Sequence, residues 1–78
     1  MDGLTEGRVV HFVTQAGDHR PAVVVRVWAT GRPGYINLQV LTDGSNDGEW
    51  GKANIVWETS VDYSEEPKPR TWHWIERP

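Results

Sequence analysis

The chain has 78 residues, a net charge of −3 and no cysteine. A chain of this length forms a single domain over 1–78, and the lack of cysteine excludes a disulfide framework and thiolate metal sites. The acidic balance argues against bulk nucleic-acid binding, which needs a broad basic face. The longest aliphatic run, 22–25, is too short to span a membrane, and no secretory signal is visible at 1–7, so we expect a cytoplasmic protein.

Short apolar runs separated by turn residues predict five strands and no long helix. In chain order the strands are expected over 8–14, 21–29, 35–42, 53–58 and 72–76. The segments between them are rich in glycine, proline, aspartate and asparagine, which favour turns. Five short strands in so short a chain favour an all-β fold, a small five-stranded SH3-like barrel, because closure removes unpaired strand edges.

Alternation within each predicted strand indicates which side chains face the core. Leu38 and Val40 are in phase and are expected to point inward. Ile55 and Trp57 are in phase in the same way, so Trp57 is assigned to the core. Trp50, beside the acidic loop, is expected to be partly exposed.

Arg26 lies inside the most apolar predicted strand, where an unpaired charge is costly. One interpretation is a salt bridge to Glu58 or Asp62, or an outward-facing position. The other is a guanidinium that binds the phosphate or carboxylate of a ligand. Trp28 follows on the same face, and the pair suits a cation–π stack or a slot for a flat ring.

The closing strand contains Trp72, His73 and Trp74. In an extended strand the two indoles share one face and His73 points the other way. We expect one indole in the core and the other in a ligand-binding surface, with the positive charge of Arg70 at the entrance of this aromatic site. The predicted ligand-binding residues are therefore Arg26, Trp28, Arg70, Trp72, His73 and Trp74.

Catalytic and metal sites are not predicted. The three histidines, His11, His19 and His73, lie on different segments, and no serine occupies a nucleophile elbow. The loop 43–48 resembles the start of a calcium-binding loop, but its twelfth position is Asn54 instead of a bidentate glutamate. We therefore expect no enzyme activity, no metal and no cofactor.

Four short segments are similar to a group of small tailed-phage proteins with a C-terminal Trp-His-Trp motif. They are 7–11 (GRVVH), 20–24 (RPAVV), 48–50 (GEW) and 71–74 (TWHW), of which the last is the most specific. In that group proline commonly follows the motif, whereas Ile75 follows it here. The resemblance implies a phage origin, with the infected bacterial host as the location, and a shared barrel.

The leading functional hypothesis is a non-enzymatic binding protein for a flat, anionic, nucleotide-like molecule. Stacking on an aromatic ring contributes about 1–3 kcal/mol per base, and a phage protein that sequesters a host defence signal needs affinity without chemistry. So small a barrel would form its pocket between subunits of a homo-oligomer. The alternative is an SH3-like module that binds a host or phage protein, or a minor virion component.

Overall fold

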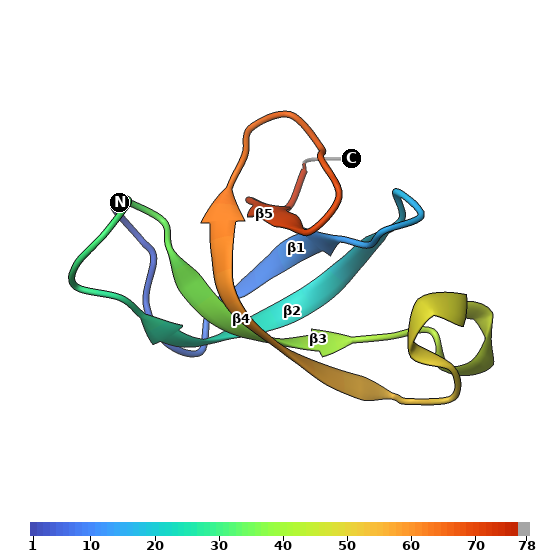
Figure 1. The fold of residues 1–78 in the computed structure, drawn as a ribbon. Helices are drawn as coiled ribbons and strands as arrows, with labels where there is room; N and C mark the ends of the chain where they lie inside the picture. The colour runs from blue at the N-terminus through green and yellow to red at the C-terminus, as the bar shows by residue number, and fades with distance from the viewer. Residues whose placement is uncertain (77–78) are drawn as a thin grey trace.

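The computed structural model describes residues 1–76, which form a closed five-stranded β-barrel with no α-helix among them (Figure 1). The elements are β1 (Val9–Val13), β2 (His19–Val27), β3 (Ile36–Leu41), the 3-10 turns η1 (Gly44–Asn46) and η2 (Gly48–Trp50), β4 (Ile55–Tyr63) and β5 (Thr71–His73). The predicted all-β, SH3-like barrel is confirmed. No helix in this part of the chain is long and apolar enough to cross a membrane.

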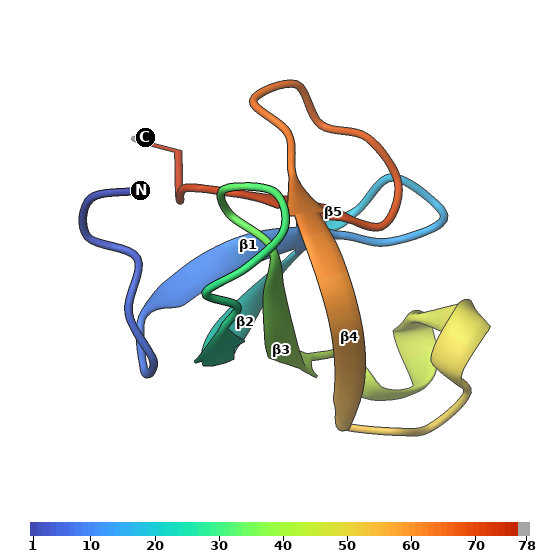
Figure 2. The ribbon, with the colours of Figure 1, turned by 60° about the vertical axis from the view of Figure 1, so that its left-hand side comes forward.

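The order of the strands around the barrel is their order in the chain. Antiparallel pairing joins β1 to β2, β2 to β3 and β3 to β4, whereas β5 pairs parallel to β4 and antiparallel to β1. Figure 1 shows β5, β1 and β2 side by side, and Figure 2 shows β3 and β4 running alongside each other. The last strand therefore closes the barrel against the first.

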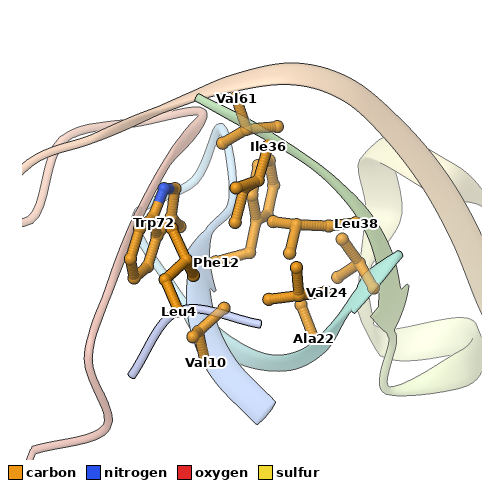
Figure 3. Close-up of a cluster of buried hydrophobic side chains, with 10 residues drawn as sticks. Leu4, Val10, Phe12, Ala22, Val24, Ile36, Leu38, Val61 and Trp72 are labelled. Carbon is orange, nitrogen blue, oxygen red and sulfur yellow. The ribbon is translucent and has the colours of Figure 1, made fainter. Parts of the chain in front are cut away.

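The core lies inside the barrel and is built from every strand. Its largest fully buried side chains are Trp72 and Phe12, which are direct partners across β1 and β5 (Figure 3). The inward positions of β3 predicted by alternation are confirmed, since Leu38 and Val40 have no exposed surface. Trp50 packs against this core and is partly buried, as expected.

The predicted core position of Trp57 is wrong. Its side chain is 54% exposed, and that of Ile55 is 58% exposed. The reason is a β-bulge in β4, where Thr59 and Ser60 together oppose the single residue Asn37 of β3. Ser60 has a φ of 58°, in the left-handed region. The bulge shifts the alternation by one residue, so Ile55 and Trp57 before it face outward while Val61 after it faces inward.

The strand ends also differ from the predictions. β2 begins at His19, two residues before Pro21, because His19 pairs with Val13 across the first hairpin. β4 extends to Tyr63, and β5 ends at His73, three residues before the predicted end. The chain after His73 therefore leaves the sheet before Glu76.

Candidate functional site

Trp72 is a core residue and is not available to a ligand at the surface. Its side chain is fully buried, and its indole Nε1 donates a hydrogen bond to the carbonyl oxygen of Gly34 at 2.6 Å. Its ring contacts those of Tyr63 and Trp74 edge to face, with centroids 5.0 and 5.1 Å apart. Trp74 is partly buried and packs against the core, with the Arg8 guanidinium carbon 5.2 Å from the centroid of its ring. Trp72 is therefore removed from the predicted ligand-binding set.

Arg26 and Trp28 form the cation–π pair that their spacing suggested. The guanidinium carbon lies 4.7 Å from the centroid of the indole ring. The indole Nε1 donates to Asn37 Oδ1 at 3.0 Å, which fixes the ring orientation. Neither suggested acidic partner pairs with Arg26, because Glu58 pairs with Arg70 and Asp62 with Arg32. This pair is an exposed stacking surface on the outside of the barrel.

Arg70 has a structural role instead of the predicted place at an aromatic site. Its guanidinium lies 2.5 Å from Glu58 Oε1 and 3.5 Å from Glu49 Oε2. Its backbone N–H donates to the carbonyl oxygen of Val13 at 2.8 Å. These contacts tie the loop before β5 to β1, β4 and η2.

The barrel brings together the three histidines that the sequence leaves apart. His11 of β1 and His73 of β5 are register partners, and His19 of β2 is the partner of Val13, two residues beyond His11. Directly paired residues of antiparallel strands share a face of the sheet, and so do residues two apart on one strand. All three imidazoles therefore project from the outer face of the barrel, with ring centroids 4.7–5.9 Å apart.

Glu76 completes this group by folding back over the three rings. Its Oε1 lies 2.6 Å from His11 Nδ1 and 3.0 Å from His73 Nε2, and its Oε2 lies 2.8 Å from His19 Nδ1. We call these four residues the histidine cluster. The backbone N–H of Glu76 itself and then the imidazoles of His11 and His73 hold the pKa of the Glu76 carboxyl at about 2. The carboxylate is therefore ionised at neutral pH.

His73 is the most enclosed member of the histidine cluster. It is only 5% exposed, and neither of its ring nitrogens has a hydrogen-bond partner of acceptable geometry among residues 1–76. Nε2 of His73 lies 3.0 Å from Glu76 Oε1 but does not form a well-aligned hydrogen bond with it. A buried polar group without a partner is costly, and both ring nitrogens of His73 have unused capacity to bind a further group.

The donor set of the histidine cluster suits a transition-metal ion. One ligand atom from each residue lies within 4.8 Å of all the others. Zinc bonds to imidazole nitrogen at about 2.0–2.1 Å, so tetrahedral ligand atoms lie about 3.3 Å apart. Binding would draw the four donors together by up to about 1.5 Å. The sequence prediction of no metal considered only the lack of cysteine and the loop 43–48. It did not consider the three histidines, which lie on different segments and which the barrel brings together.

His73 is the one predicted site residue in the histidine cluster, and sequence reasoning missed His11, His19 and Glu76. The sequence carries one signal for His11 and one for Glu76, and none for His19. Alternation places His11 on the opposite face of its strand from Phe12, and His73 on the opposite face from Trp72. Because Phe12 and Trp72 point into the core, both histidines face outward once β1 and β5 pair. Glu76 follows His73 by three residues, a spacing that lets a chain turn back on itself.

A second feature of the outer surface is an apolar face on β3 and β4. Leu41 is the register partner of Ile55, and Gln39 is that of Trp57. Leu41, Ile55 and Trp57 are each more than one third exposed. We call these three residues the outer apolar face.

Comparison with known proteins identifies no relative. No protein-family model, curated protein or solved structure matches the chain. Functional inference therefore depends on the arrangement of this chain's own residues.

Proposed function

We propose that the protein is a non-enzymatic binding module organised around a metal ion held by the histidine cluster. The single observation that supports this most strongly is the convergence of four donors from three strands and the C-terminal segment within 4.8 Å. Imidazole with one carboxylate is a donor set typical of zinc and of other late first-row metals. The one carboxylate in the cluster, that of Glu76, contacts all three imidazoles. Because it is engaged in these contacts, it is better suited to help bind a ligand than to act as a free general base.

The partner that we propose is the one suggested by the sequence, an anionic, nucleotide-like small molecule. Residues 1–76 form no pocket of their own, so a bound molecule would lie on the barrel surface or between subunits. The metal would hold its anionic group. His19 begins β2 and Trp28 follows its end, up to about 30 Å away along the strand, so a Trp28 ring that stacks on the flat part of the same molecule would belong to a second subunit. For a phage protein, sequestering such a signal in the infected host cell is a use that needs no catalysis.

Native mass spectrometry of protein purified without an affinity tag and without chelators tests the metal centre. We expect one zinc-class ion per chain, retained by wild type and lost by the His19→Gln variant. The exposed Glu65 gives a matched control, because Glu65→Gln removes a carboxylate that lies outside the histidine cluster. A wild-type chain that neither retains nor takes up zinc, cobalt or nickel would rule out the proposed centre.

The outer apolar face favours a second candidate function, an SH3-like module that binds a host or phage protein. Exposed indoles are enriched at protein interfaces, and Trp57 is more than half exposed. Recovery of one protein in stoichiometric amount from infected-cell lysate by wild type, but not by Trp57→Thr, would support this function. Equal recovery by both proteins would exclude the outer apolar face as the contact surface.

A further inference from the structure

The four members of the histidine cluster are not equally fixed. The imidazoles project from β1, β2 and β5, whose backbones are paired within the barrel. Glu76 instead comes from the irregular segment after β5, and its side chain is 49% exposed. The three histidines therefore form the rigid part of the cluster, and the glutamate is the part that can leave.

The position of the Glu76 carboxylate shows what kind of group fits the cluster. One oxygen approaches His11 and His73, and the other approaches His19, at 2.6–3.0 Å. A single oxyanion thus reaches all three imidazoles. His11 and His19 have side chains that are 25% and 29% exposed, so a molecule from solvent can reach the same place.

We infer that Glu76 is an exchangeable ligand, and that the metal centre binds an external small-molecule oxyanion, of the phosphate or carboxylate class, in its place. The inference rests on the proposed function, because it assigns the ligand class of that same centre. The exchange is a ligand substitution. The metal–oxygen contact of Glu76 is released, a contact to an oxygen of the incoming anion forms, and no proton or electron is transferred.

This arrangement has a quantitative consequence for affinity. An external anion competes with an internal carboxylate, so its apparent affinity equals its intrinsic affinity multiplied by the fraction of time for which the fourth position is free. If Glu76 occupies that position about nine-tenths of the time, removing its charge strengthens anion binding about tenfold. The three strand-borne histidines still hold the metal, since three protein ligands suffice in zinc sites with an open position.

Cobalt(II) titration tests the inference because the visible spectrum of bound cobalt reports its ligands. Wild type, Glu76→Gln and the control Glu65→Gln are loaded with one equivalent of cobalt and then titrated with inorganic phosphate, adenosine monophosphate or acetate. We expect all three proteins to bind cobalt, and phosphate to perturb the Glu76→Gln spectrum at about tenfold lower concentration than in the other two. The three anions distinguish free phosphate, a phosphate ester and a carboxylate as ligands.

The other outcomes have separate meanings. If phosphate perturbs the spectra of wild type and Glu76→Gln at the same concentration, Glu76 does not compete with the anion and the exchange is overturned. If wild type binds no cobalt, the proposed metal centre itself is wrong. If wild type binds cobalt but Glu76→Gln does not, Glu76 is an obligatory ligand and the exchange is overturned. If Glu76→Gln binds cobalt and its spectrum ignores all three anions, the centre stands and the oxyanion inference fails.

Discussion

At the scale of single residues, Asn37 determines which side chains of β4 face outward. Its side-chain oxygen accepts hydrogen bonds from Trp28 Nε1, Thr59 Oγ1 and the backbone N–H of Ser60, at 3.0, 3.0 and 2.8 Å. One buried amide thus satisfies the bulge and also orients the indole that stacks with Arg26. Nothing in the alternation of β4 indicates such a contact, because it depends on a residue of another strand.

Replacing Asn37 by Ala is expected to lower the free energy of unfolding by about 2 kcal/mol, because three donors lose their acceptor. Urea denaturation monitored by fluorescence measures this loss. Asn46→Ala, at an exposed position in η1, is the matched control and should change the midpoint little. A loss below about 0.5 kcal/mol for Asn37→Ala would contradict a role for this amide in holding the bulge.

Asp47 gives a pH-dependent contribution to stability. It forms a bidentate pair with Arg20 at 2.7 Å to each oxygen, and it accepts a hydrogen bond from the Asp43 backbone N–H. The Arg20 side chain, and then that N–H, lower the pKa of the Asp47 carboxyl below its ordinary value. A depressed folded-state pKa means that the stabilisation is present above the unfolded pKa of about 3.8 and is lost as pH falls below it.

We therefore expect wild type to lose more stability than Asp47→Asn between pH 6 and pH 3, and the variant to be the less stable protein at pH 6. Urea midpoints at the two pH values measure both differences. Parallel losses in the two proteins would show that the Arg20 pair does not contribute to acid sensitivity.

At the scale of strands, local patterns predict elements well and predict their ends and irregularities poorly. Five strands and the inward face of β3 follow from short-range alternation. The bulge in β4 could not be predicted, because it is stabilised by a buried side chain of β3. The histidine cluster could not be assembled either, since it depends on the pairing of β1 with β5, which are about sixty residues apart in the chain.

The two tryptophans at 57 and 72 provide a direct comparison of strand faces. Trp72→Ala is expected to cost about 3–5 kcal/mol, because it leaves a cavity in the core and an unpaired Gly34 carbonyl. Trp57→Thr, at an exposed strand position, is expected to cost less than about 1 kcal/mol. Urea denaturation of both variants tests the face assignment, and similar costs would contradict the bulged register of β4.

At the scale of the whole molecule, a bound metal would join three strands that the barrel already pairs. β1, β2 and β5 each supply one imidazole, and β5 is held by only two residue pairs on each side. A ligand that binds only the folded state raises the free energy of unfolding by about 2.7 kcal/mol at a concentration one hundred times its Kd. At that zinc concentration we expect the free energy of unfolding of wild type to rise by this amount and that of His19→Gln to stay nearly unchanged. Urea denaturation with and without a chelator measures both. Equal effects on both proteins would place the zinc elsewhere.

The most direct test of the metal centre is nuclear magnetic resonance of the imidazole rings during a zinc titration. The chain has three histidines, so every imidazole signal can be followed. Binding at the histidine cluster predicts that one equivalent of zinc shifts the ring signals of His11, His19 and His73 together, in slow exchange. Shifts confined to one ring, or appearing only with a large excess of zinc, would contradict the centre.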